Sequence, residues 1–300
     1  MEKQYVLYNP HAGNGRGETN ARTLENIVTD AELVFCDMTK INSYTDFFAS
    51  ISEGEVIIIC GGDGTLNRFV NDTKDIDIPT PIYYYPAGSG NDFANDLGKK
   101  NTDKPFPIEE YLRDLPTVYV NGMERLFING IGYGVDGYCC EVGDELRAKS
   151  DKPVNYTSIA IKGLLFHYKR SDATVTVDGV TKKYKGAWIA PTMNGRFYGG
   201  GMMPTPEQDR LSPDGKLSFM TLYKAGKLRT LMIFPSIFKG EHVKNTKYVD
   251  IIEGKDITVR FERPTALQID GETVLGVTEY RVVSGKNAKA QSSAEQTAAV

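Results

Sequence analysis

The stretch that decides the fold is EVIIICGGDGTLNRFVND, residues 55–72, in which a run of apolar residues leads directly into Gly-Gly-Asp-Gly-Thr. The apolar run predicts a buried strand, and the residues after the glycines predict a helix. A parallel strand that turns at once into a helix directs the free N–H groups of that helix over the edge of the sheet. Phosphate groups bind at such an edge, because the helix N-terminus offers N–H donors and a partial positive charge.

Each residue of this turn has a use at a phosphate site. Gly61, Gly62 and Gly64 lack the β-carbons that would keep a phosphate away from the backbone. Asp63 could hold a magnesium ion and Thr65 could cap the helix. The alternative is an ordinary glycine-rich turn between a strand and a helix, for which the glycine pair alone is equally suited.

Two further loops of the same kind follow other predicted strands. NPHAGNGRG, residues 9–17, comes after the first strand, and PAGSGNDFAND, residues 86–96, comes after the fourth. Because the carboxyl ends of parallel strands meet at one edge, three glycine-rich polar loops together favour a binding site over three unrelated turns. Arg16 in the first loop either lies near the phosphates or is a solvated loop residue.

The hydrophobic pattern of the sequence differs between two parts of the chain. Up to about residue 120, short apolar runs alternate with segments of helix length, which predicts an α/β domain with a mainly parallel sheet. Residues 121–285 contain alternating, β-branched runs with turn signals between them, which predicts antiparallel β structure. A helix-like segment, 153–168, interrupts this part. Whether the final strand, near 277–285, pairs within this part or returns to the first domain is left open. The tail, 286–300, has the polar, small-residue composition of disorder.

Composition excludes several classes of protein. With 300 residues, a net charge of −4 and a pI near 5.6, the chain has no bulk positive field for a nucleic-acid partner. Its four cysteines show no C-x-x-C spacing, which predicts reduced thiols in a reducing cytosol. No apolar run approaches the roughly 18 residues of a spanning helix, and the N-terminus lacks the apolar core of a signal peptide. We therefore expect a cytoplasmic protein, with at most peripheral contact with a membrane.

The segments GGDGTLN, PAGSGNDFA and NPHAG together resemble the diacylglycerol kinase catalytic family, especially its soluble bacterial lipid kinases. Further matching stretches follow in the same order, namely FINGIGYGVDG at 127–137, GGGMMPTPEQDRLSPDGKL at 199–217 and QIDGE at 268–272. The resemblance covers nearly the whole chain. It implies a Rossmann-like nucleotide domain of the NAD kinase and diacylglycerol kinase type, followed by an all-β C-terminal sandwich that the lipid approaches. Catalysis would take place in the cleft between the two domains.

The same resemblance implies an ATP-dependent lipid kinase that uses Mg²⁺ and phosphorylates the hydroxyl of a diacylglycerol-like or sphingoid lipid. Asp270 is then the general base, and Glu272 contacts magnesium or supports the groups around it. Asp209 and Asp214 match a structural magnesium site. The implied nucleotide-binding residues are Asn9, Gly61, Gly62, Asp63, Gly64, Thr65, Asn67, Gly88, Ser89, Gly90, Asn91 and Asp92.

Several of these residues have a structural alternative. Asp270 and Gly271 form the dipeptide most typical of a tight hairpin, and Asp178-Gly179, which has no other match to the family, is predicted to be such a turn only. Asp209 and Asp214 also suit a solvated loop, and Asp136 either faces the cleft or caps a turn. The histidines, which show no metal-ligand spacing, are interpreted as surface or satisfied residues, and Trp188 as core.

One position departs from the family pattern. Many members carry glutamate after the asparagine of GGDGTxN, whereas this chain has Arg68. The arginine would contact a phosphate if it faced the nucleotide, and would change only packing if it faced a neighbouring strand.

Two other functions remain open beside the lipid kinase: an NAD kinase-like enzyme, and a non-catalytic nucleotide- or lipid-binding module of the same fold. The apolar segments 158–168 and 231–244 are bordered by lysines, and they suit either a lipid entrance or amphipathic helices packed on the sandwich. Transient docking on an anionic membrane surface would use Lys239, Lys244 and Lys247. A homodimer is also left open.

Overall fold

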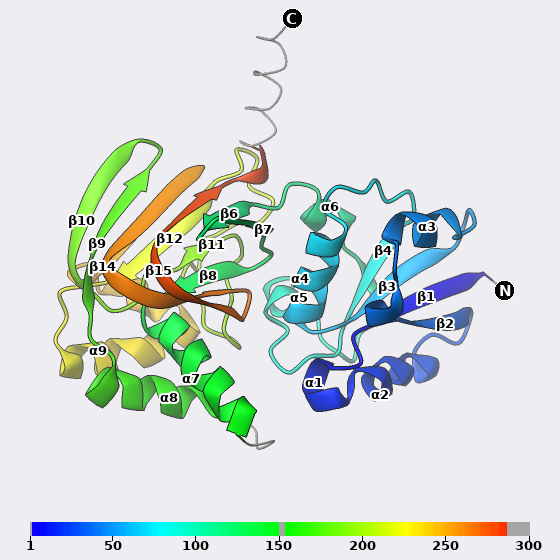
Figure 1. Cartoon of the computed structure of the whole chain (residues 1–300), viewed down its shortest axis with the longest axis horizontal. Coiled ribbons are helices and arrows are strands. Elements are labelled where there is room, and N and C mark those ends of the chain that lie inside the picture. Colours follow the sequence, from blue (N-terminus) through cyan, green and yellow to red (C-terminus); the bar gives the residue numbers. More distant parts are fainter. Residues whose placement is uncertain (1, 150–153, 287–300) are drawn as a thin grey trace, which may run out of the picture. The chain divides into compact units, whose positions relative to one another are not determined.

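The computed structural model describes residues 2–149 and 154–286 and divides the chain into two compact units, 1–113 and 114–300 (Figure 1). The boundary lies a few residues before the expected one at 120, because the strand Thr117–Val120 pairs within the second unit. From residue 287 onward, the tail that we expect to be disordered lies outside the described residues.

Unit 1 is an α/β domain. Its sheet has the order β2-β1-β3-β4-β5, in which β1 to β4 are parallel and β5 is antiparallel to β4. The strands are β1 Lys3–Tyr8, β2 Glu32–Asp37, β3 Val56–Gly61, β4 Ile82–Pro86 and β5 Phe106–Pro107. The helices are α1 Ala12–Gly15, α2 Gly17–Arg22, η1 Thr23–Asn26, η2 Met38–Lys40, α3 Tyr44–Ala49, α4 Asp63–Asp72, α5 Asp92–Asp96 and α6 Glu109–Leu112. The four apolar runs that predict parallel strands are thus confirmed.

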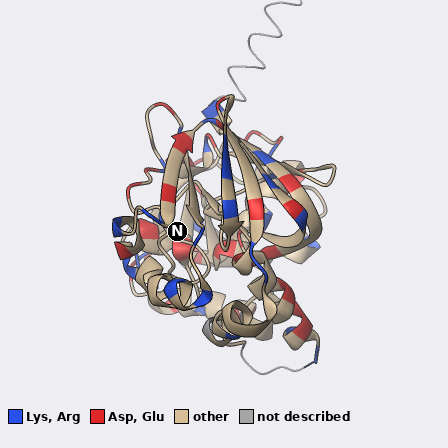
Figure 2. Ribbon diagram, turned by 90° about the vertical axis from the view of Figure 1, so that its left-hand side faces the viewer, with Lys and Arg blue, Asp and Glu red and all other residues tan. Residues whose placement is uncertain are grey.

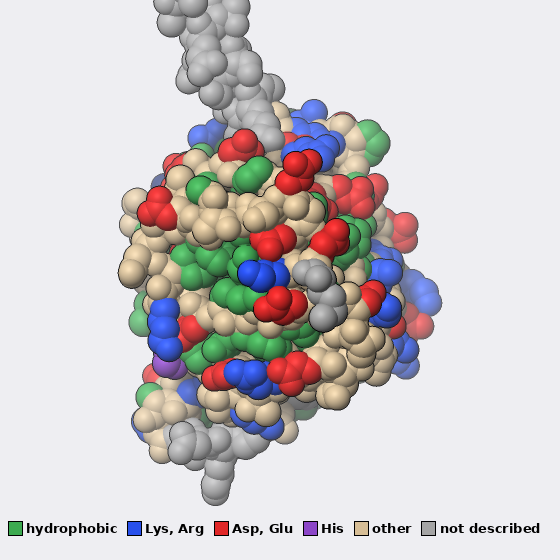
Figure 3. Space-filling model, turned by 90° about the vertical axis from the view of Figure 1, so that its right-hand side faces the viewer, with side chains coloured by type: hydrophobic (Ala, Val, Ile, Leu, Met, Phe, Trp, Pro, Cys, Tyr) green, Lys and Arg blue, Asp and Glu red, His purple; other side chains and the backbone are tan. Residues whose placement is uncertain are grey.

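Both faces of this sheet are covered, which explains the continuous apolar runs. Val6 of β1 and Ile58 of β3 belong to a core that includes Ala21 and Leu24, from the α2–η1 segment. On the other face, Tyr84 of β4 meets Phe93 of α5 edge to face, with ring centroids 5.6 Å apart. Figure 3 shows one face of the molecule, on which hydrophobic side chains lie in bands between charged ones.

Unit 2 is an antiparallel β-sandwich with helices. Its strands are β6 Thr117–Val120, β7 Met123–Leu126, β8 Gly130–Tyr133, β9 Ser171–Val177, β10 Val180–Ala187, β11 Thr192–Met193, β12 Leu217–Leu222, β13 Val249–Gly254, β14 Asp256–Ile269 and β15 Glu272–Val283. Its helices are α7 Val135–Lys149, α8 Tyr156–Lys162, the π-helical η3 Gly163–His167, α9 Lys227–Ile233, η4 Phe234–Lys239 and η5 Glu241–Lys244. The predicted antiparallel character of this half is confirmed.

The long strand β14 joins the two layers of the sandwich. Its first half pairs with β9 and its second half with β8, and the register with β15 shifts between Arg260 and Thr265. Pro264 lies in this irregular stretch, where its missing N–H breaks no ladder bond. Because of this bend, the β14–β15 hairpin contributes to both layers. The layers enclose a core in which the rings of Tyr133 and Phe261 stack, with their centroids 4.0 Å apart.

The sequence left open whether the last strand returns to the first domain. The structure shows that it does not. β15 pairs with β14 along its length and with β6 at its end, so that residues 277–283 belong to the sandwich of unit 2. Arg260 and Glu279 lie opposite each other on this hairpin and form an ion pair at 2.9 Å. Figure 2 shows Lys and Arg positions interleaved with Asp and Glu positions along strands of the molecule.

Helix α7 is not predicted by the sequence. It starts directly after the end of β8 and contains Gly137 and Gly143, which disfavour a helix in isolation. Tertiary packing requires both glycines: a β-carbon at Gly137 would collide with the carbonyl of Ala266 on β14, and one at Gly143 would press on the ring of Tyr156. Within 2–149 and 154–286, no helix is long and apolar enough to cross a bilayer.

Candidate functional site

The three glycine-rich loops of unit 1 follow β1, β3 and β4, which are neighbours in the sheet, so the loops share its carboxyl edge. Asp63, the first residue of α4, connects two of them. Its Oδ2 atom accepts a hydrogen bond from Asp92 N at 2.8 Å, and its Oδ1 atom accepts one from Phe93 N at 2.9 Å. One carboxylate therefore caps helix α5 while it begins helix α4.

Backbone contact joins the same two loops. A β-carbon on Gly62 would lie 3.1 Å from the Cα atom of Gly88, and one on Gly88 would collide with Gly62. These glycines are thus needed for the close approach of two chain segments, a purpose that the sequence does not reveal. Gly61 similarly makes room for the buried side chain of Thr65.

Gly64 differs from the other glycines of this turn. It lies in the first turn of α4, its residue is exposed, and no atom lies within 4 Å of the position that a β-carbon would take. Gly64 is therefore the position in the Gly-Gly-Asp-Gly turn with open space in front of the backbone, as a phosphate requires.

Asn91 closes the third loop on itself. Its Oδ1 atom accepts from Gly88 N at 3.0 Å, its Nδ2 atom donates to Gly88 O at 2.7 Å, and its backbone adopts a left-handed conformation with φ of 50°. The carbonyl of Gly90 accepts a hydrogen bond from Asn95 Nδ2 at 3.0 Å, and Ser89, between Gly88 and Gly90, is exposed. The loop is therefore held rigidly by its own amide side chains.

The first loop is tied to the third. Asn20 of α2 donates from Nδ2 to the carbonyl of Ala87 at 3.2 Å. The carbonyl of Asn9 lies so close to Gly17 that a β-carbon there would collide with it, and Asn9 Oδ1 accepts from His11 N at 3.0 Å. Arg16 is exposed and donates to the carbonyl of Gly13 within its own loop at 3.2 Å.

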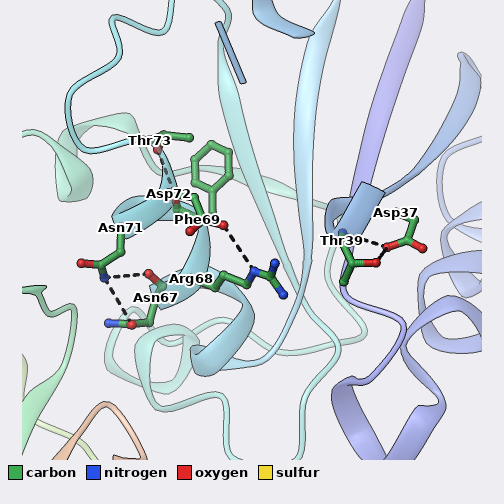
Figure 4. A network of polar contacts seen from close by, with 8 residues as sticks. All are labelled: Asp37, Thr39, Asn67, Arg68, Phe69, Asn71, Asp72 and Thr73. Atoms are coloured by element: carbon green, nitrogen blue, oxygen red, sulfur yellow. Dashed lines mark hydrogen bonds and ion pairs between the residues drawn. The ribbon is translucent and has the colours of Figure 1, made fainter. Parts of the chain in front are cut away.

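Asn67 and Arg68 of helix α4 are also singled out by the resemblance (Figure 4). Asn67 is fully buried and accepts from Asn71 Nδ2 at its backbone carbonyl, 2.9 Å away. Arg68 forms an ion pair with Asp72 one turn further along, with 3.3 Å between Nε and Oδ2. The arginine is thus paired on the surface of its own helix, and its contact with a phosphate stays a prediction.

Asp270 lies in unit 2, in the two-residue turn between β14 and β15. Its carboxylate accepts three backbone hydrogen bonds from the segment 128–130, which leads into β8: Oδ2 from Ile128 N at 2.5 Å, and Oδ1 from Asn129 N at 2.8 Å and Gly130 N at 3.0 Å. Asp270 therefore anchors the hairpin to another segment of the chain.

The turn at Asp178 has the same construction. Asp178 and Gly179 have φ of 46° and 85°, and Asp270 and Gly271 have φ of 46° and 93°, as two-residue hairpins of type I′ require. Asp178 Oδ1 also accepts two backbone N–H groups, from Lys255 and Asp256, each at 2.9 Å. The prediction that Asp178 lies in a turn is confirmed, and local geometry does not distinguish Asp270 from it.

Two further side chains hold the segment 128–130, and sequence reasoning identified neither of them. Arg210 donates to Ile128 O and to Asn129 Oδ1, both at 2.6 Å, and Asn194 donates to Ile128 O at 2.9 Å. Arg210 lies inside a stretch that resembles the family, but no spacing rule distinguishes it there. Glu272, on the far side of the turn, forms an ion pair with Arg125.

The two carboxylates predicted to hold a structural magnesium are engaged separately. Asp209 Oδ1 accepts from Leu211 N at 2.9 Å, while Asp214 accepts from Ser212 Oγ at 2.6 Å and pairs with Lys216 at 2.9 Å. These hydrogen bonds, first that from Ser212, lower the pKa of Asp214 to about 2. No group of three or more His, Cys, Asp or Glu residues that could hold a metal occurs in the described part of the chain.

Asp136 is buried, with 5% of its surface exposed, and accepts a hydrogen bond from the hydroxyl of Tyr198. Burial raises the pKa of Asp136 to about 7, and the Tyr198 hydrogen bond opposes that rise in part. The carboxyl lies at the start of α7, beside the apolar cluster that contains Val135 and Cys139. It therefore lies in the interior of unit 2 and caps no surface turn.

The remaining predictions concern single residues. Trp188 is core, as predicted, and donates from Nε1 to Ala225 O at 2.8 Å. His11 and His167 are exposed. His242 is fully buried with Nε2 against Pro204 O at 2.8 Å, and burial lowers its pKa. The four thiols are unpaired, and two of them, Cys60 and Cys139, are buried.

Comparison with known protein families agrees with this architecture. The model of the diacylglycerol kinase catalytic domain matches residues 3–117, and that of the YegS C-terminal NAD kinase beta sandwich-like domain matches residues 129–288. The chain belongs to the diacylglycerol kinase family. The two matched regions correspond to the α/β unit and to the sandwich.

Individual members of the diacylglycerol kinase family show the same relationship. A diacylglycerol kinase of Bacillus subtilis (strain 168) is 26% identical over 287 residues, which cover 91% of this chain and 90% of that protein. A diacylglycerol kinase of Mycobacterium tuberculosis is 27% identical over 205 residues, 65% of this chain and 64% of that protein. The fold matches a crystal structure of a diacylglycerol kinase from Bacillus anthracis str. Sterne, with a TM-score of 0.57, 19% identity and coverage of 95% and 94%.

The first prediction concerns the carboxylate that joins the loops. In Asp63→Asn, one oxygen becomes an amide that faces an N–H donor, so we expect unit 1 to lose about 1–3 kcal/mol of stability in denaturant unfolding. Asp72→Asn on the same helix removes an exposed ion pair and should cost less than about 1 kcal/mol. Equal losses in the two variants would contradict the role of Asp63.

The second prediction concerns pH. Because burial raises the pKa of Asp136 to about 7, the folded state binds a proton that the unfolded state releases near the usual pKa of 3.8. This carboxyl therefore lowers the stability of unit 2 as pH rises from about 4 to about 7. Asp136→Asn should gain stability relative to the parent chain across that window, measured as the difference between their unfolding free energies. If the difference between the two unfolding free energies did not change with pH, the pKa of Asp136 would not be raised in the folded state.

Proposed function

We propose that this protein is an ATP-dependent lipid kinase, which transfers the γ-phosphoryl group to the hydroxyl of a diacylglycerol-like or sphingoid lipid. The observation that carries the proposal is the linkage of the two glycine-rich loops by Asp63, which places the N-termini of α4 and α5 beside each other at the carboxyl edge of the sheet. The N-terminus of α4, where Gly64 is exposed, would supply N–H donors and positive partial charge to a triphosphate, while the first N–H groups of α5 are bonded to Asp63. Membership of the diacylglycerol kinase family supports a lipid as the acceptor.

This geometry supports the binding of ATP. The phosphates would lie against the turn at Gly64, with Asn9 and the loop 88–91 beside it. Magnesium, when bound with ATP, would neutralise charge on the β- and γ-phosphate oxygens. Since Asp63 already accepts two N–H groups, most ligands of the ion would be phosphate oxygens and water, as is common for Mg²⁺ with nucleotides. Asp63 would then be at most one ligand among several.

The general base is proposed to be Asp270. Its three N–H donors fix the orientation of the carboxylate, which a base requires before the reaction. The proton from the lipid hydroxyl would move to the carboxylate as the oxygen attacks the γ-phosphorus. Asp270 belongs to unit 2 and the phosphate loops belong to unit 1.

The acceptor is tested directly with radiolabelled ATP. Mixed micelles that contain diacylglycerol or sphingosine should yield labelled lipid, whereas empty micelles should not. NAD in the same assay tests the alternative of an NAD kinase-like enzyme. Label in NAD alone would reject the lipid kinase, and no transfer to any acceptor, with ATP still bound, would indicate a non-catalytic module.

The third prediction concerns Gly64. A β-carbon there would lie in open space, and valine suits a helix better than glycine, so Gly64→Val should fold as well as the parent chain. Its side chain would occupy the space assigned to phosphate, and ATP affinity in calorimetry should fall at least about tenfold. Gly62→Val is a weaker test, because its side chain presses on Gly88 and would disturb the loops. Unchanged affinity in folded Gly64→Val would remove the phosphate assignment.

The fourth prediction separates catalysis by Asp270 from its structural role, with Asp178→Asn as the matched control. Both substitutions replace a carboxylate that accepts backbone N–H groups in a type I′ turn, so both should lower stability. Only Asp270→Asn should lower the rate of lipid phosphorylation, by about 10²–10⁴-fold, with ATP affinity nearly unchanged. Comparable rates for the two folded variants would show that Asp270 serves only to anchor the turn.

A further inference from the structure

Two adjacent peptide groups in unit 2 provide the N–H groups of Asn129 and Gly130 that donate to the carboxylate of Asp270. A peptide group is planar, so its carbonyl and its N–H move together and point in opposite directions. The carbonyl of the first peptide group is that of Ile128, and the carbonyl of the second is that of Asn129. Contacts on these two oxygens therefore control where the N–H groups point.

Both carbonyls are held on the side opposite the carboxylate. The carbonyl of Ile128 accepts hydrogen bonds from Arg210 Nη1 at 2.6 Å and from Asn194 Nδ2 at 2.9 Å. The carbonyl of Asn129 accepts from the backbone N–H groups of Asn194 at 2.9 Å and Gly195 at 3.0 Å. The two peptide groups thus lie between the carboxylate and a second set of donors.

Arg210 contributes a charged donor to this second set. Its Nη2 atom donates to Asn129 Oδ1 at 2.6 Å, so one guanidinium holds both the Ile128 carbonyl and the side chain of the next residue. Hydrogen bonds from a charged donor are stronger than those between neutral groups. A donor on a carbonyl oxygen also polarises the peptide group, which strengthens its N–H as a donor at the other end. The contact of Arg210 with Ile128 therefore reinforces the bond from Asn129 N to Asp270.

The loop 208–216, which carries Arg210, is itself fixed. Gln208 is buried, and its Nε2 atom donates to the carbonyl of Lys216 at 3.0 Å, which closes the loop. Its Oε1 atom accepts from the hydroxyl of Ser218 on β12 at 2.6 Å. The guanidinium of Arg210 is therefore presented from a rigid loop, as a residue that orients another group requires.

We propose that Arg210 is a positioning residue for phosphoryl transfer: it orients the peptide group between residues 128 and 129 and, through that group, the carboxylate of Asp270. This inference rests on the proposed function, in which Asp270 is the general base. A guanidinium stays protonated, so Arg210 itself takes no proton from the lipid. Loss of its contacts should slow the chemical step, because a base acts only in the correct orientation. ATP, which is assigned to the loops of unit 1, should bind as before.

Steady-state kinetics of lipid phosphorylation test this role with three variants. Arg210→Gln should lower kcat about tenfold, with the KM for ATP within about twofold of the parent chain. Arg210→Lys keeps the charge but loses the two-pronged contact, so its kcat should lie between those of the parent and Arg210→Gln. Arg170→Gln is the matched control, because Arg170 also donates from Nη1 to a backbone carbonyl of unit 2, that of Ala225 at 2.8 Å. Its kcat should stay within about twofold of the parent.

Combination with Asp270→Asn separates positioning from a general loss of structure. If Arg210 acts through the base, Arg210→Gln should lower the residual rate of Asp270→Asn by less than about twofold. An equal loss in both backgrounds would show that Arg210 acts independently of Asp270, and would overturn the proposal.

Hydrogen exchange of the amides of residues 128–130 tests the contact without any substrate. Exchange should be faster in Arg210→Gln than in the parent and unchanged in Arg170→Gln. Unchanged exchange in Arg210→Gln would overturn the proposal. A parent chain that phosphorylates no acceptor would reject the kinase and this role together, whereas an active parent whose kcat is unchanged in Arg210→Gln would reject the role of Arg210 alone.

Discussion

The pair of hydrogen bonds from Asp63 to the backbone of Asp92 and Phe93 is the constraint on which the candidate site depends. It fixes α4 against α5, and with it the contact between Gly62 and Gly88 that no larger residue would allow. The side chain of Asn20 adds the first loop to this assembly through Ala87. Three loops from separate parts of unit 1 thereby form one rigid edge, and rigid donors are what phosphoryl transfer requires.

Unit 2 uses the same device for a different purpose. Asp178 and Asp270 each occupy the first position of a type I′ hairpin and each accept backbone N–H groups from another segment. The carboxylates join a hairpin to the remainder of the sandwich, so the Asp-Gly pair has a structural use in both places. What distinguishes Asp270 is its surroundings: the segment 128–130 that it holds is also held by Arg210 and Asn194. Such convergence of polar side chains on one backbone segment is absent from the contacts that we describe at Asp178.

Sequence patterns predict the parallel strands well, because both faces of that sheet are buried and its strands are continuous apolar runs such as residues 56–60. They also locate the three loops, since glycine-rich turns after such runs are local features. They fail for α7, where Gly137 and Gly143 oppose helix formation and only contact with Ala266 and Tyr156 explains their presence. The roles of Gly62, Arg68 and Arg210 are also hidden, because each depends on a partner that the linear sequence does not identify.

The central claim is that the linked loops form one phosphate site for ATP. Hydrogen exchange of backbone amides, followed by mass spectrometry with and without ATP and magnesium, tests it most directly. The account predicts that ATP slows exchange in the peptides that cover residues 61–66 and 88–93 together, because one triphosphate contacts both and Asp63 couples them. Protection confined to unit 2, or to one of these two peptides while the other exchanges as before, would contradict it.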